Sequence, residues 1–174
     1  IVADPWYAPA GYDRGRIRNV AKFSWKQSKT FRDELFRKNV NPVFIDSEEG
    51  AILLGDKTLQ ARASAFDAIN VRRLFIVLEK SIATYAKYKL FEFNDAFTRN
   101  NFVNAVEPTL REVQGRRGIT SFDVKCDEEN NPPSVIDRNE FVASIFVAPN
   151  RAIRGILLNF VATPTGVNFE ELEV

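Results

Sequence analysis

The strongest helical pattern of the chain lies in residues 66–90, FDAINVRRLFIVLEKSIATYAKYKL. Its apolar residues recur every three or four positions, which places them on one face of a helix, while most of the charged residues fall elsewhere. The apolar face consists of Val71, Leu74, Phe75, Leu78, Ile82 and Tyr85. The segment therefore predicts an amphipathic helix that covers a hydrophobic core.

A second helix is expected on the carboxyl side of this segment. Thr98 is a suitable amino-terminal cap for it. Pro108 lacks an amide proton and crowds the preceding turn, so it is expected to kink or divide the helix. The stretch GRRG at residues 115–118 is expected to end it. Apolar residues at helical spacing follow the cap, namely Phe102, Val103 and Val106.

The carboxyl third of the chain predicts β-structure. Residues 121–127 alternate between apolar and polar side chains, as a half-buried strand does. Residues 141–148 and 153–162 are apolar on both faces, which is typical of central strands covered on two sides. Residues 163–174 contain Pro164 and three glutamates, and we expect this tail to detach from the body.

The amino-terminal side combines a short helix with a hairpin. Residues 28–38 predict a helix capped by the serine at its start. Strand-like runs at 43–45 and 51–54 flank a turn at 48–50, which indicates a β-hairpin. Residues 1–20 mix Pro, Gly and aromatic residues, and we expect an extended segment lying on a surface. The expected fold class is α/β (α+β), with a mixed or antiparallel sheet flanked by helices and extended terminal arms.

The overall composition is that of one folded domain without strong charge. Over 174 residues, 45% are hydrophobic and 27% are charged, and 24 basic residues against 23 acidic ones leave a net charge of +1. This balance argues against a dominantly electrostatic partner such as bulk nucleic acid or an anionic membrane. The apolar runs are too short to cross a bilayer. Because the chain has no methionine, even at position 1, it is expected to be a piece of a longer protein.

The residue types exclude several common catalytic chemistries. The chain has no histidine, which excludes Ser-His-Asp and Cys-His nucleophile pairs and His-ligated zinc. Cys126 is the only cysteine, so an intrachain disulfide is excluded, and the alternation of its strand predicts a buried structural thiol. The carboxylates fall mostly in turns and in the tail, where solvated charge is expected. We assign no catalytic, cofactor-binding or metal-binding residue.

Two patterns could still indicate a binding function. Residues 50–58, GAILLGDKT, come close to a phosphate-binding loop, but Asp56 interrupts the required Gly-Lys-Thr, so a strand followed by a turn is expected. Basic clusters at 14–18 and 116–117, with aromatic residues such as Trp25, could contact nucleic acid, and a protein–protein surface explains the same residues. Composition and spacing leave both an interaction or structural module and a nucleic-acid-binding domain open.

A resemblance to a known family narrows this choice. Six stretches, in this order along the chain, resemble the carboxyl-terminal region of contractile tail sheath proteins of T4-like bacteriophages. They are DPWYAPAGYDRGRI (4–17), NVNPV (39–43), GDKT (55–58), FDAINVRRL (66–74), LFEFND (90–95) and LNFVAT (158–163).

The resemblance implies a structural subunit that is not an enzyme and needs no cofactor. Residues 1–20 would be an extended surface segment, 21–162 the conserved inner domain and 163–174 a carboxyl-terminal arm. Terminal arms of this family add strands to the sheets of neighbouring subunits, and the sheath contracts to drive a tube through the host envelope. The expected partners are identical subunits, the tail tube protein, and baseplate and tail terminator proteins, without nucleic acid or membrane insertion. The expected location is the phage tail in the virion, after assembly in the host bacterial cytoplasm.

Within that framework two sets of residues are candidates for contacts between proteins. Backbone hydrogen bonds of an added strand supply affinity, and apolar side chains of the arm supply anchors. The candidate arm residues are Pro164, Val167, Phe169 and Leu172. The arginine-rich segment 98–118 either faces the tube or forms a solvated outer face. The first assignment rests on exposed ion pairs, which can be released singly during contraction. Its candidate residues are Arg99, Arg111, Arg116 and Arg117.

Overall fold

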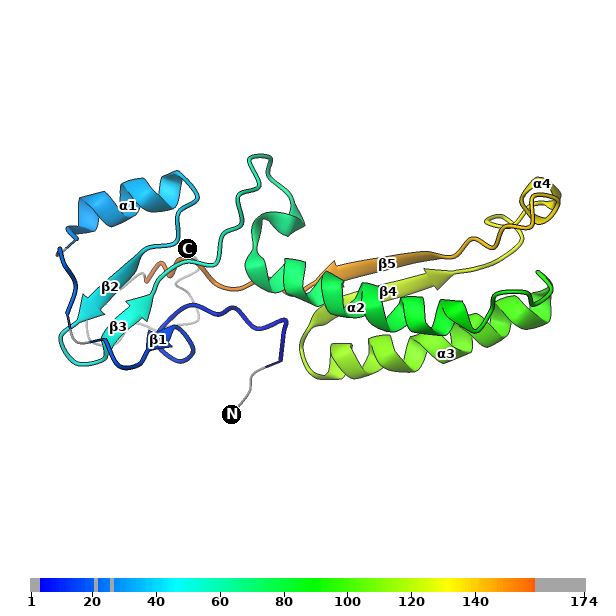
Figure 1. Cartoon of the computed structure of the whole chain (residues 1–174), viewed down its shortest axis with the longest axis horizontal. Helices are drawn as coiled ribbons and strands as arrows, with labels where there is room; N and C mark the ends of the chain where they lie inside the picture. The colour runs from blue at the N-terminus through cyan, green and yellow to red at the C-terminus, as the bar shows by residue number, and fades with distance from the viewer. Residues whose placement is uncertain (1–3, 21, 26, 159–174) are drawn as a thin grey trace, which may run out of the picture.

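A computed structural model of the chain describes residues 4–20, 22–25 and 27–158. The molecule is elongated, with a three-stranded sheet and helix α1 at one end and two long helices beside a two-stranded ribbon at the other (Figure 1). The strands pair antiparallel in both sheets. This mixture of helices and antiparallel strands confirms the expected α/β fold class.

The three-stranded sheet contains the predicted hairpin. Strands β2 (Val43–Asp46) and β3 (Gly50–Leu53) form the hairpin, and β1 (Arg16–Ile17) pairs with the other edge of β3, which gives the order β1-β3-β2. Helix α1 (Lys29–Arg37) lies beside this sheet (Figure 1). The predicted cap is confirmed, because the Ser28 hydroxyl accepts a hydrogen bond from the backbone N–H of Phe31 at 3.3 Å.

Helix α2 (Ile69–Lys87) confirms the principal sequence prediction. A short 3₁₀ helix, η1 (Ala65–Asp67), precedes it and is capped by the hydroxyl of Ser64. The apolar face buries Val71, Leu74 and Leu78, as the spacing predicts.

Helix α3 (Ala96–Gly115) differs from its prediction at two points. The cap is Asp95, whose carboxylate accepts a hydrogen bond from the backbone N–H of Thr98 at 2.8 Å, so Thr98 lies inside the first turn. Pro108 neither ends nor divides the helix. Both Pro108 and Asn104, whose carbonyl loses its usual donor, are exposed, so water can satisfy that carbonyl while the opposite face stays packed.

The carboxyl third forms one ribbon instead of a wider sheet. Strands β4 (Ile119–Lys125) and β5 (Ser144–Pro149) pair with each other, and the short helix α4 (Pro133–Ile136) lies in the connection between them. The prediction of two central strands is wrong in the described residues, because β5 pairs with β4 alone and residues 153–158 form no strand. The remaining part of that predicted strand, residues 159–162, lies outside the described residues.

The hydrophobic core lies between the two long helices and the ribbon. Helices α2 and α3 pack against each other, and α3 packs against β4. The apolar faces of the ribbon complete this core, whereas Phe146 on the opposite face of β5 is 58% exposed. The buried core residues are Trp6, Leu74, Leu78, Phe102, Val106, Leu110, Val113, Ile119 and Cys126.

Candidate functional site

The outer edge of strand β5 is open. Within the described residues β5 hydrogen-bonds only to β4, so the backbone groups along its other side have no strand partner. Such an edge is a template for pairing with an extended segment of another chain. Phe146 stands on this strand opposite Asp123, and its ring is more than half exposed.

An apolar groove lies between the start of α2 and the ribbon. Phe66 of η1 and Phe75 of α2 form one wall, with their rings edge to face at a centroid distance of 4.8 Å. Residues of both ribbon strands form the other wall, and the groove has a volume of about 570 Å³. An extended peptide lying here could pair with β5 and place alternate side chains against Phe66 and Phe75.

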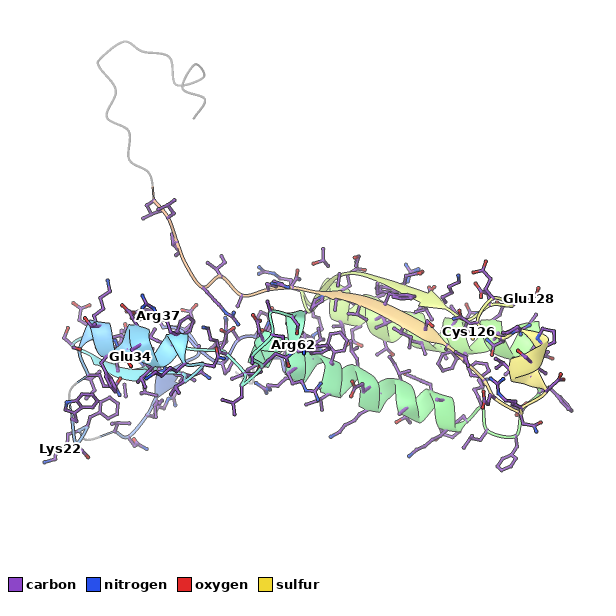
Figure 2. All side chains as sticks on the ribbon, turned by 90° about the horizontal axis from the view of Figure 1, so that it is seen from above. Lys22, Glu34, Arg37, Arg62, Cys126 and Glu128 are labelled. Atoms are coloured by element: carbon purple, nitrogen blue, oxygen red, sulfur yellow. The ribbon has the colours of Figure 1, made fainter. Side chains whose placement is uncertain are left out.

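The chain itself supplies an extended apolar segment next to this groove. After β5, residues 151–158 leave the body of the molecule without helix or strand structure (Figure 2). Four large apolar side chains in this segment are between 68% and 87% exposed. They are Ile153, Ile156, Leu157 and Leu158. Contiguous exposed apolar residues of this kind mark a surface that another protein covers.

The segment is anchored to the body by one arginine. The guanidinium of Arg154 contacts the carboxylate of Asp56 through Nε at 2.8 Å and that of Asp67 through Nη1 at 3.6 Å. Asp56 is only 4% exposed, although the sequence predicts a turn there. Sequence reasoning missed this ion pair because its partners are 98 positions apart.

The predicted arm residues Pro164, Val167, Phe169 and Leu172 lie outside the described residues. Their role in contacts between subunits therefore stays a prediction. Residues 153–158, which precede this arm in the chain, carry exposed apolar side chains.

Three of the four predicted tube-facing arginines, Arg111, Arg116 and Arg117, lie exposed near the end of α3. Arg111 forms an ion pair with Glu107 one turn earlier, at 3.0 Å, with 70% of its side chain exposed. Arg117 follows the end of the helix and adopts a positive φ of 63°, which turns the chain into β4. The two residues share one end of the α3–β4 unit, and their role at a tube stays a prediction.

Arg116 has an additional structural contact. Its guanidinium pairs with Asp4 and with Glu112, and it lies 5.3 Å from the ring centre of Trp6. The indole N–H of Trp6 donates to the carbonyl oxygen of Arg116 at 3.0 Å. Because a Cβ at Gly118 would lie 3.1 Å from this ring, glycine permits the close approach. These contacts hold the amino-terminal segment against the end of α3.

Arg99 does not share that surface. It is 6% exposed, and its guanidinium donates to the side-chain oxygen of Asn94 at 3.4 Å. Its helical position places it on the same face as the buried Phe102 and Val106, three and seven residues later. In the described structure Arg99 is therefore a buried residue apart from the exposed arginines, and its role at a tube stays a prediction.

No group of three or more potential metal-binding side chains is gathered in the part of the chain that the structure describes. Cys126 is buried as predicted, and burial raises the pKa of its thiol, which opposes formation of the nucleophilic thiolate (Figure 2). None of the described helices has the length and apolar content needed to cross a bilayer.

An open strand edge, an adjoining apolar groove and an exposed apolar segment characterise a domain that assembles with other proteins. The sequence comparison identifies the kind of assembly protein. Residues 62–163 match the model of the phage tail sheath C-terminal domain, and the chain belongs to this family.

Curated relatives extend the similarity over nearly the whole chain. The tail sheath protein of Vibrio phage KVP40 is 50% identical over 98% of this chain, and that of Enterobacteria phage T4 is 47% identical over 98%. The tail sheath protein of Salmonella phage ViI is 43% identical over 99%. The chain spans only 26–27% of the length of these relatives.

Solved structures show that the fold is shared with contractile injection systems. A chain of the anti-feeding prophage baseplate superposes with a TM-score of 0.82 at 21% identity, covering 92% of this chain and 46% of that one. The sheath of an extracellular contractile injection system, in the contracted state, gives a TM-score of 0.79 at 21% identity, with coverage of 91% and 46%. These neighbours establish the fold of the described residues.

Proposed function

We propose that this chain is the carboxyl-terminal part of a contractile tail sheath subunit, a structural component of a phage virion that is not an enzyme. Identical subunits would polymerise helically around a tail tube and contract to drive the tube through the host envelope. The region described here would link the copies, and baseplate and terminator proteins would contact the ends of the polymer. Family membership and the relatives named tail sheath protein support this function.

The observation that carries the proposal is that the same chain has both a free strand edge and an exposed apolar segment that could add to such an edge. Strand β5 has a free edge beside an apolar groove, and residues 153–158 expose apolar side chains without a strand partner in the described chain. When one copy's segment occupies another copy's edge, the contact is heterologous. Contacts of this kind generate open helical polymers when the rotation does not close a ring.

The exposed arginines near the end of α3 would face the tube. Exposed ion pairs contribute about 0.2–1 kcal/mol each, so they can break one subunit at a time, whereas strand-added links bury more surface and persist. In the described structure Arg111 best fits this role, because its side chain is largely exposed and its partner Glu107 lies on the same helix.

Electron microscopy of the whole polypeptide that carries this region tests the proposal. Incubation with and without tubes should give tubular helical polymers that lengthen along the tubes. A stable monomer that retains nucleic acid would overturn the sheath assignment and support a nucleic-acid-binding domain.

A lysine on the open edge tests the linking mechanism. Phe146→Lys should keep the fold, because the new ammonium lies opposite Asp123 on β4, while a charge on the edge opposes strand addition. Polymers should be lost although thermal unfolding stays close to that of the wild type. The matched control, Leu59→Lys, makes the same change on a side chain that is 86% exposed in a loop, and should assemble normally. Normal polymers with Phe146→Lys would contradict addition at this edge.

Charge reversal tests the tube face separately. Arg111→Glu should leave polymers of the subunit intact and weaken their attachment to tubes, measured by co-sedimentation at low and moderate salt. The control is Arg138→Glu, a reversal of an arginine that pairs with Glu140 near α4. Tube binding equal to the wild type with Arg111→Glu would remove this residue from the tube face.

A further inference from the structure

The chain leaves the ribbon from a rigid point. The backbone N–H of Asn150 donates to Gly118 at 3.2 Å, and its side-chain amide donates to the carbonyl oxygen of Arg117 at 2.9 Å. The hydroxyl of Thr120 donates to its side-chain oxygen at 2.7 Å, and the amide of Asn70 donates to its carbonyl oxygen at 3.3 Å. Four hydrogen bonds from both sides therefore fix the residue that follows β5.

A second fixed point comes four residues later, at Arg154. Its two carboxylate partners belong to segments that are themselves tied together by the backbone. The carbonyl oxygen of Asp56 accepts from the N–H of Ile69 at 2.7 Å, and that of Asp67 accepts from the N–H of Thr58 at 2.9 Å. The guanidinium thus binds to the rigid junction between the three-stranded sheet and α2, not to a loose loop.

The buried carboxylate of Asp56 makes this contact specific. Its Oδ1 receives Nε of Arg154, whereas Oδ2 is buried without a hydrogen-bond partner among the described residues. A carboxylate in such surroundings requires a cation close by, because burial penalises an unpaired charge. Arg151 lines the same small cavity, but the ion pairs in the described chain come from Arg154.

Among the described residues beyond Arg154, which are 155–158, the side chains make no hydrogen bond or ion pair to the body. A Cβ at Gly155 would meet no atom within 4 Å, and the side chains of Ile156 and Leu157 are 80% and 87% exposed. The contacts of Asn150 and Arg154 fix the direction in which the chain leaves the ribbon, and Gly155 directly after them is a point at which it can turn. We propose that Arg154 is the positioning residue that aims the carboxyl-terminal segment at the neighbouring copy, an inference that rests on the proposed linking function.

A double substitution distinguishes two roles of Arg154: positioning of the carboxyl-terminal segment and neutralisation of the buried carboxylate of Asp56. Arg154→Met alone leaves Asp56 unpaired, so it should lower the unfolding temperature of the subunit and impair assembly. Arg154→Met with Asp56→Asn removes both charges, so the unfolding temperature should recover. If Arg154 aims the segment, assembly should stay impaired in the double variant, with the critical concentration raised about tenfold because the segment is no longer preorganised.

The control is Arg151→Met, a change at the other arginine of the same segment, which should assemble like the wild type. The experiment uses the whole polypeptide with tubes present and follows assembly by light scattering and electron microscopy. Normal assembly of the double variant would overturn the positioning role. If the wild type itself formed no polymers, the proposed sheath function would fail instead, so the two failures are distinguishable.

Discussion

The three-stranded sheet at one end of the molecule and the β4–β5 ribbon at the other are stabilised by different interactions (Figure 1). The ribbon lies on a core of large apolar side chains from α2 and α3. The three-stranded sheet buries mainly Ala51 and Ile52 of β3, and it depends on close backbone contacts. Among these, the N–H of Leu53 donates to the carbonyl oxygen of Gly15 at 2.8 Å, and the N–H of Gly11 donates to that of Leu53 at 2.9 Å.

In the β4–β5 ribbon, different parts of the same strands therefore serve the stability of the fold and the proposed contact between subunits. The ribbon's inner face is fixed by packing, so its outer edge can stay open in the described structure without loss of the fold. Native edge strands must be blunted or covered to avoid uncontrolled pairing. In a subunit that polymerises, a well-supported open edge is useful, because the partner strand then adds to a preformed surface.

The largest effect is expected from a substitution that disrupts the packing of the ribbon half, which consists of α2, α3 and the β4–β5 ribbon. Leu110 is fully buried between the helices and the ribbon, so Leu110→Ala should lower the free energy of unfolding by about 2–5 kcal/mol. Urea unfolding measures the loss. The control Leu59→Ala, at an exposed side chain, should stay within about 0.5 kcal/mol of the wild type. A loss below 1 kcal/mol at Leu110 would mean that packing does not dominate in this half.

A smaller effect is expected from crowding the backbone of the three-stranded sheet. A Cβ at Gly15 would lie 2.7 Å from the carbonyl oxygens of Gly11 and Leu53, so Gly15→Ala should cost about 1–3 kcal/mol. Hydrogen exchange should show the lost protection in β1 and β3, with α3 little changed. Gly115→Ala is the control, since no atom lies within 4 Å of its Cβ and the last turn of α3 accepts alanine. An equal loss of hydrogen-exchange protection in α3 would contradict the conclusion that the three-stranded sheet and the ribbon end are stabilised separately.

Local patterns in the sequence were sufficient for the elements whose stability is local. The spacing of apolar residues located α2, and the Ser28 cap located the start of α1. The turn before Gly50 located the β2–β3 hairpin, where that glycine adopts a φ of 79°. In each of these elements the residues that decide the structure are close together in the chain.

The errors concern features that depend on distant parts of the chain. Pro108 was expected to kink or divide α3, but the helix is not divided, because its opposite face is packed. Residues 141–148 have apolar side chains on both faces whether or not a second strand pairs with them. The hydrophobic pattern therefore could not predict how many strands lie beside β5. The burial of Arg99 and the contact between Asp56 and Arg154 depend on the assembled fold, and no local motif marks either of them.

The smallest expected effect is the response of the amino-terminal end of α3 to acid. The hydrogen bond from the backbone N–H of Thr98 lowers the pKa of Asp95 below its ordinary value of about 3.9. A group with a lowered pKa in the folded state stabilises the fold above its unfolded pKa, and this contribution is lost as the pH falls through the folded pKa. Hydrogen exchange at the start of α3 should therefore increase on acidification, without an equal change at the start of α1, where the uncharged Ser28 is the cap. Asp95→Asn keeps a capping oxygen that does not titrate, so it should flatten this pH dependence. An unchanged acid response in Asp95→Asn would show that another group of the ribbon half controls it.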